Sequence, residues 1–225
     1  MEPALDKTNG AYSQFNLPTN NGTHLLRSQV YEYLREELKK ENMRPGMFVS
    51  INQLTSEMNI SRTPLRDALL QLQAEGFVTF LPQRGIQINE LKRSDISNIY
   101  EMLGALDSTV LYRVFDRIGP QEIRKMERIN EEMKKRISDK SYFKYFELNS
   151  SFHGVYLDLS QNNFLLNQVN ILRQRLFDFG NAGDWVEKVR TLNYEEHLVM
   201  IKLIKSGDAH KASEYMRDVH CSINW

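Results

Sequence analysis

A short run of basic and hydroxyl residues, Ser61 to Arg66 (SRTPLR), has the side chains expected of a segment that contacts nucleic acid. Arginine can donate two hydrogen bonds to O6 and N7 of guanine, and hydroxyl groups bond phosphate oxygens. If a helix begins at Ser61, then Arg62 and Thr63 lie in its first turn, where the helix dipole adds partial positive charge. Arg66 follows on an exposed side. The run predicts a DNA-contacting helix; the alternative is a surface helix whose arginines pair with neighbours.

Two helices joined by a short turn are predicted around this run. In the helix that follows Ser61, four apolar residues recur with the i, i+3, i+4, i+7 spacing of one buried face: Leu65, Ala68, Leu69 and Leu72. Ser50 and Gln53 form a capping-box pair that opens a preceding helix over residues 51–58. The turn at residues 59–60 gives the spacing of a helix-turn-helix.

After Gly76 the apolar pattern changes from a helical period to alternating residues. Residues 77–81 and 86–88 are therefore predicted to be two strands, joined by a hairpin that contains Arg84 and Gly85. A further amphipathic helix precedes the others, with an apolar stripe at Leu26, Val30, Leu34 and Leu38. Three helices followed by a basic, glycine-tipped hairpin predict a winged helix-turn-helix domain over residues 23–91.

These residues resemble the N-terminal signature of the GntR family of bacterial transcription regulators over roughly residues 24–90. The resemblance rests on the run from Ser61 to Leu69, with Leu72, Glu75-Gly76 and Arg84-Gly85. It implies that five positions contact operator DNA: Ser61, Arg62, Thr63, Arg66 and Gly85. Asn52 stands where many relatives carry a DNA-contacting arginine, so a smaller electrostatic contribution is expected from that helix. The basic Arg84 at the wing is expected to contact phosphate.

The composition of the 225 residues is that of a soluble globular protein with a net charge of zero, so DNA binding must come from a local basic patch. The single cysteine, Cys221, fits a reducing compartment. The chain has no segment with the apolar length of a membrane span or signal peptide, and we expect a cytoplasmic protein that contacts no membrane. Residues 1–22 are predicted to be a flexible arm.

From Ser94 onward the sequence has only helical patterns, and residues 94–222 are predicted to form an all-α bundle of about six helices. Ser94-Asp95 is expected to cap the first of these helices, and the stretch at 181–184 is expected to be a loop. The predicted fold class is therefore mainly α, with an N-terminal winged helix-turn-helix and a C-terminal all-α helical bundle.

This second part resembles the FCD effector-binding domain of FadR-like regulators in the GntR family. The marks are the run from Asn149 to His153, then Glu196-His197, and Gly207-Asp208. Many FCD domains hold a divalent metal with one Asp and three His. The resemblance implies a metal site at Asn149, His153 and His197, and the first two, four residues apart, share one helical face.

Two departures affect that site. Asn149 replaces the family's Asp and offers only a neutral amide oxygen. The family's last His falls on Val219 when residues are counted without gaps, and His220 is turned about 100° around an α-helix. His220 would therefore be a ligand only if the helix changed its register. Buried histidines in a degenerate site are the alternative, so a divalent metal such as zinc is an open hypothesis.

A third departure concerns the effector. The arginine that often meets an effector carboxylate appears as Leu103, and Arg173 and Arg175 are the candidate replacements, with surface roles as the alternative. The combined prediction is a homodimeric, ligand-responsive repressor that binds a palindromic operator. The alternative keeps DNA binding but makes the bundle a dimerisation scaffold without effector or metal. An enzyme is not expected, because no His-Glu-x-x-His helix accompanies the histidines.

Overall fold

The computed structural model of the chain describes residues 23–137, 142–178 and 185–222. The proposed arm at 1–22 and the proposed loop at 181–184 lie outside these ranges. The chain divides into two compact units, and the change from the first to the second falls between Leu91 and Lys92. No helix in the described ranges is long and apolar enough to cross a membrane.

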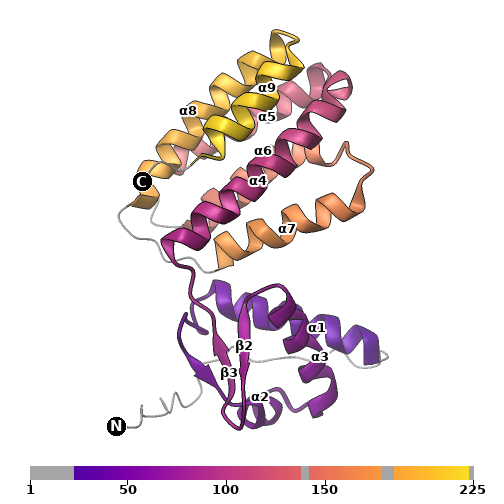
Figure 1. The fold of residues 1–225 in the computed structure, drawn as a ribbon, viewed down its shortest axis with the longest axis vertical. Coiled ribbons are helices and arrows are strands. Elements are labelled where there is room, and N and C mark those ends of the chain that lie inside the picture. The colour runs from indigo at the N-terminus through magenta and orange to yellow at the C-terminus, as the bar shows by residue number, and fades with distance from the viewer. Residues whose placement is uncertain (1–22, 138–141, 179–184, 223–225) are drawn as a thin grey trace. The chain divides into compact units, whose positions relative to one another are not determined.

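In its described residues, the first unit contains three helices and a small antiparallel sheet (Figure 1). Its elements are α1 (Thr23–Lys39), β1 (Phe48–Val49), α2 (Ile51–Met58), α3 (Arg62–Ala74), β2 (Val78–Leu81) and β3 (Gly85–Ile88). The strands lie in the order β1-β3-β2, with Thr79 opposite Gln87 in the hairpin and Phe48 opposite Gln87 on the other edge. This is a winged helix-turn-helix. β1 was not predicted, because two residues are too few to establish an alternating pattern.

The core of the first unit collects the apolar faces of all three helices and the sheet. Its fully buried side chains include Leu34 of α1, Leu54 of α2, Leu65 and Leu69 of α3, Phe77, and Ile86 and Ile88 of β3. The predicted stripe on α3 is buried as expected. Burying each such side chain contributes about 1.5–3 kcal/mol, so this face fixes α3 in place.

The turn between α2 and α3 depends on Asn59, which adopts the left-handed conformation with φ of 51°. Asparagine tolerates this conformation better than most residues. The Ser50 hydroxyl accepts a hydrogen bond from the Gln53 N–H at 3.4 Å, while the Gln53 side chain bonds Glu57. The predicted capping box is thus only half formed.

The second unit is helical throughout its described residues (Figure 1). Its helices are α4 (Arg93–Val114), α5 (Pro120–Lys135), α6 (Tyr142–Leu157), α7 (Asn163–Asp178), α8 (Trp185–Lys205) and α9 (Ala209–Tyr215). A 3-10 turn follows α4 at Phe115–Arg117, and a π-helical turn, Met216–His220, continues α9. α4 packs against α9 and the π turn, and α5 packs against α6 and α8. The predicted fold class is confirmed.

The start of α4 differs from the prediction. The helix begins at Arg93, and Asp95 lies inside its first turn, where the carboxylate accepts a hydrogen bond from the Lys92 N–H at 2.9 Å. Ser94 therefore is not the cap. The expected turn before the last helix is present: Gly207 has a φ of +76°, and Asp208 caps α9 by accepting from the Lys211 N–H.

Candidate metal centre and DNA-contacting surface

The start of α3 presents its polar side chains to solvent. Ser61, Arg62, Thr63 and Arg66 are exposed, whereas Pro64 and Leu65 are buried against the core. Ser61 occupies the N-cap position, but its hydroxyl makes no capping hydrogen bond. The hydroxyl and the N-terminal N–H groups of α3 thus remain available to a phosphate, which a helix N-terminus attracts.

Asn52 contacts one of the candidate arginines. The Arg62 guanidinium donates a hydrogen bond from Nη2 to Asn52 Oδ1 at 2.9 Å, and both side chains are exposed. The amide that stands where relatives carry an arginine therefore joins α2 to the first turn of α3. This hydrogen bond holds the Arg62 side chain at the N-terminus of α3.

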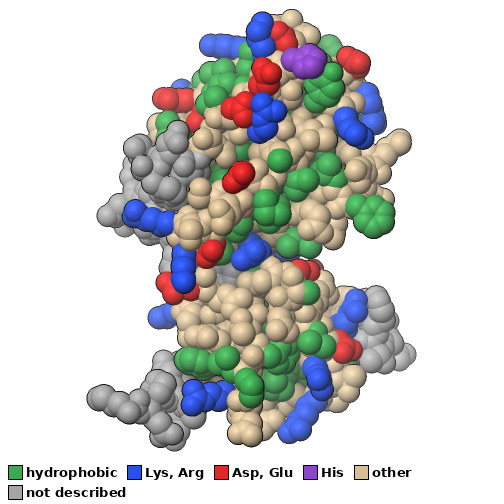
Figure 2. Space-filling view, viewed as in Figure 1, with side chains coloured by type: hydrophobic (Ala, Val, Ile, Leu, Met, Phe, Trp, Pro, Cys, Tyr) green, Lys and Arg blue, Asp and Glu red, His purple; other side chains and the backbone are tan. Residues whose placement is uncertain are grey.

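The wing carries Arg84 exposed at its tip, next to Gly85. A Cβ at Gly85 would lie 2.4 Å from the carbonyl oxygen of Val49, and its φ is +93°. Glycine is required here by the close approach of β1 and by the backbone conformation. On the face drawn in Figure 2, basic side chains project from this unit at several separate places.

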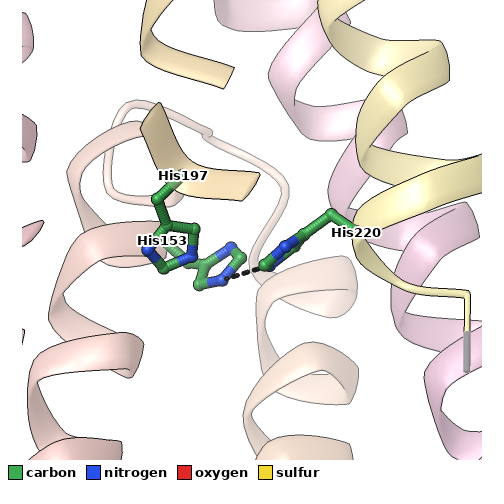
Figure 3. Close-up of side chains that lie close together, drawn as sticks. All are labelled: His153, His197 and His220. Atoms are coloured by element: carbon green, nitrogen blue, oxygen red, sulfur yellow. Dashed lines mark hydrogen bonds between the residues drawn. The ribbon is translucent and has the colours of Figure 1, made fainter. Parts of the chain in front are cut away.

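In the second unit, three histidines from distant parts of the sequence meet in the interior. His153 lies on α6, His197 on α8 and His220 at the end of the π turn, with exposed fractions of 3%, 0% and 7%. One ring nitrogen of each lies within 4.8 Å of a ring nitrogen of both others. Figure 3 shows the three rings facing one another, with His153 Nε2 and His220 Nε2 only 3.2 Å apart.

The π turn explains how His220 joins the group. A π-helical turn contains one residue more than an α-helical turn, so it moves the following side chains around the axis. Val219 is consequently 43% exposed, while His220 is buried and faces His153. The register change on which the sequence prediction depended is therefore present. Gly104 of α4 permits it, because a Cβ there would come within 2.9 Å of Cys221 Cβ.

Each histidine is held through its Nδ1 atom. His153 Nδ1 lies 2.9 Å from the Tyr156 hydroxyl, His197 Nδ1 lies 3.2 Å from Asn130 Oδ1, and His220 Nδ1 lies 2.8 Å from Glu196 Oε2.

The partners of these contacts are oxygen atoms that can accept a hydrogen. Asn130 presents its oxygen to His197, since its nitrogen donates to the Tyr194 carbonyl. Tyr156 donates to Asp107 at 3.3 Å, so its oxygen accepts from His153. A carboxylate can only accept from His220. Each Nδ1 atom thus meets an oxygen that can accept its hydrogen, and the Nε2 atoms are the ones directed toward the other rings.

The Nε2 atoms of the three histidines are directed toward the centre of the cluster. In the described residues His197 Nε2 and Asn149 Oδ1 are buried without a hydrogen-bond partner. The Asn149 side chain is only 8% exposed. His153 Nε2 and His220 Nε2 are hydrogen-bonded to each other at 3.2 Å. Burial lowers the pKa of His153 and of His197 well below 6.5, helped by the charges of Arg173 and His220, so both are neutral at pH 7. Three imidazoles and an amide oxygen suit a divalent cation of borderline softness.

The two candidate effector arginines differ in their surroundings. Arg173 is buried, not a surface residue, and its Nη2 atom forms an ion pair with Asp107 Oδ2. Arg175 is partly buried, and its Nε atom has no hydrogen-bond partner among the described residues. Leu103, at the position where relatives carry the arginine, is buried in α4.

Four residues that support the histidines were not predicted: Asp107, Asn130, Tyr156 and Glu196. Asp107 could have been noticed in the sequence. It lies four residues after Leu103 on the apolar stripe of α4, where a charged residue is unexpected. It is 1% exposed. Asn130 also falls on the buried face of α5. Nothing in the sequence pairs either with a histidine.

Comparison with known proteins gives concordant matches to both units. The family described as "Bacterial regulatory proteins, gntR family" matches residues 26–88, and the family described as "FCD domain" matches residues 98–220. The chain is 29% identical to the Nta operon transcriptional regulator of Aminobacter aminovorans over 163 residues, which cover 72% of this chain and 76% of that protein.

Two further matches span most of the chain. The HTH-type transcriptional repressor RspR of Escherichia coli (strain K12) is 26% identical over 220 residues, covering 86% of this chain and 96% of that protein. The solved structure of E. coli McbR/YncC has a TM-score of 0.69 at 17% identity, and the match covers 87% of this chain and 93% of that chain. At this identity the structural match shows a common fold.

Proposed function

The chain belongs to the GntR family of bacterial regulatory proteins and carries an FCD domain, and from this premise we propose a metal-dependent, ligand-responsive repressor. As a member of this family it is a DNA-binding transcription regulator. In the proposal it binds a short palindromic operator as a homodimer. Its bundle holds a divalent cation that completes the binding site of a small anionic effector.

The DNA-binding part of the proposal is supported by the separation of faces on α3. One face is buried in the core, and Ser61, Arg62, Thr63 and Arg66 project from the other. A homodimer presents two such helices about 34 Å apart, one turn of B-DNA, so the operator is expected to be a short palindrome. Arg66 is assigned to a guanine, and Arg84 on the wing to a phosphate.

The metal-binding part is supported by one observation above all: three buried imidazoles direct their Nε2 atoms toward one another. Without a cation, His153 Nε2 and His220 Nε2 contact only each other, at 3.2 Å, and His197 Nε2 is buried without a hydrogen-bond partner among the described residues. In the proposal His153, His197 and His220 hold the ion, with Asn149 as the oxygen ligand. A bound ion supplies positive charge to a pocket whose four ligands are all neutral.

This charge determines the class of effector. A divalent ion with neutral ligands favours an anion in its open coordination position, and a small carboxylate has the right chemistry. A guanidinium has five N–H donors, so Arg173 can bond Asp107 and still donate to the effector. Arg175 is the second candidate. Metal and anion should then bind cooperatively, each raising the affinity for the other by the same factor.

The test begins by selecting bound sites from random duplex DNA with the full-length protein. Operator affinity is then measured with chelator, with Zn²⁺, and with Zn²⁺ plus a panel of small carboxylates. The proposal predicts a palindromic site, and a carboxylate that changes operator affinity only when Zn²⁺ is present. His197→Ala should abolish that response and keep basal operator binding. If no carboxylate or metal changes the affinity, the bundle is a dimerisation scaffold and the proposed control is wrong.

A further inference from the structure

Asp107 is a buried carboxylate at the edge of the histidine cluster, and the ligand set proposed above does not use it. It lies on α4 and is 1% exposed. Its Oδ2 atom pairs with Arg173, accepts from the Tyr156 hydroxyl at 3.3 Å, and lies 3.4 Å from His153 Nδ1. Its Oδ1 atom is buried without a hydrogen-bond partner among the described residues.

Tyr156 connects this carboxylate to the histidine. Its side chain is fully buried, and its hydroxyl contacts both His153 Nδ1, at 2.9 Å, and Asp107 Oδ2. The proton order follows from the acceptor at the end of the chain: Tyr156 donates to the carboxylate, and His153 donates its Nδ1 hydrogen to the tyrosine oxygen. His153 therefore keeps its lone pair on Nε2, the atom that faces His220.

A hydrogen bond from Nδ1 toward a carboxylate makes Nε2 a stronger donor to a metal and fixes the orientation of the ring. Asp107 also brings a negative charge close to the ligand set, which Asn149 fails to do as a neutral amide. Arg173 offsets the cost of burying this charge. The hydrogen bonds from His153 through Tyr156 to Asp107 thus bring a negative charge close to the metal site without direct ligation. An aspartate at position 149 would bring this charge as a ligand.

We propose that Asp107 is a positioning residue of the metal site that acts through Tyr156 on His153 and compensates for the neutral Asn149. This inference rests on the proposed metal-binding function and extends it to a residue on another helix.

Tyr156→Phe tests the inference more cleanly than a change of Asp107, because it keeps the ring and leaves the Asp107–Arg173 pair intact. The matched control is Tyr145→Phe. Tyr145 is also fully buried on α6, but its hydroxyl donates at 2.7 Å to the Arg190 carbonyl and does not touch a histidine. Both variants lose one buried hydroxyl; Tyr156→Phe loses the bonds to His153 and Asp107, and Tyr145→Phe loses the bond to Arg190.

The measurement is the Zn²⁺ affinity of the full chain, by competition with a chromophoric chelator, together with the unfolding temperature of the metal-free protein. Loss of such a supporting contact typically weakens metal binding about 10–100-fold, and Tyr156→Phe should show a loss of this size. Tyr145→Phe should bind Zn²⁺ like the wild type. In the Asn149→Asp background, where a ligand carries the charge, the loss caused by Tyr156→Phe should shrink.

Each other result contradicts the inference. Wild-type Zn²⁺ affinity in Tyr156→Phe would show that the chain from Asp107 does not support the site. Equal losses in both variants, in step with lower metal-free stability, would make Tyr156 merely structural. An equal loss from Tyr156→Phe in the wild-type and Asn149→Asp backgrounds would remove the compensation. Absence of Zn²⁺ binding by the wild type would overturn the metal site itself, and this inference with it.

Discussion

Lowering the pH should destabilise the metal-free bundle through two buried histidines. Burial, together with Arg173 and His220, lowers the pKa of His153 well below 6.5, and burial with the charges of His220, His153 and Arg173 does the same for His197. In the unfolded chain both titrate near 6.5. Between the native and unfolded pKa values the unfolded chain binds more protons. The contribution of these two histidines to the free energy of unfolding is therefore fully present above pH 6.5, and it is lost as the pH falls below that value.

The size of this effect follows from the two sites. Each histidine contributes a slope of about 1.4 kcal/mol per pH unit, or about 2.7 kcal/mol for both. If both remain neutral in the native state, the free energy of unfolding drops by about 4 kcal/mol between pH 7 and pH 5. That is a large share of the roughly 5–15 kcal/mol typical of a domain.

The assay is urea unfolding in chelator across this pH range, followed by tryptophan fluorescence. Trp185 is the first residue of α8 in the second unit, so its signal reports on the bundle. A variant with His153→Gln and His197→Gln cannot titrate at these sites and serves as the control for all other groups. Its stability should fall less steeply. An equal slope in wild type and variant would refute the assignment of two neutral, buried histidines.

Three further predictions concern single side chains. Arg66→Ala should relax sequence preference by about 1–3 kcal/mol of discrimination at one base pair, measured by competition among operator variants; an equal loss on all sequences would make Arg66 a phosphate contact. Arg84→Ala should weaken binding to all sequences and make the slope of log K against log salt concentration shallower by about 0.9. The exposed Arg113→Ala in the bundle is its control, and an unchanged slope would remove Arg84 from the interface. Asn149→Asp should raise Zn²⁺ affinity without an anion; unchanged affinity would mean that residue 149 is not a ligand.

The winged unit could be predicted because the patterns that specify its helices and strands involve residues close together in the sequence. The spacing of Leu65, Ala68, Leu69 and Leu72, and the change of period after Gly76, depend on neighbours in the sequence. β1 was missed since two residues carry no period, and Ser94 was mistaken for a cap because the helix begins before it, at Arg93.

The interior of the bundle was harder to predict because its contacts join distant residues. Asp107 and Arg173 are 66 residues apart, and His197 and Asn130 are 67 apart. A count along the sequence assumes α-helical geometry, so it placed Val219 at the site, and only the π turn brings His220 inward. Such a turn depends on packing, here on the close approach that Gly104 allows, and local sequence preference does not encode it.

Zinc content after loading and exhaustive dialysis is the most direct test of the central claim, that His153, His197 and His220 hold a divalent cation. The account predicts one ion per chain in the wild type and in His210→Ala, whose imidazole is exposed and bonded to Tyr112 outside the cluster. It predicts loss of the ion in His153→Ala. No ion in the wild type, or a full complement that His153→Ala leaves untouched, would contradict it.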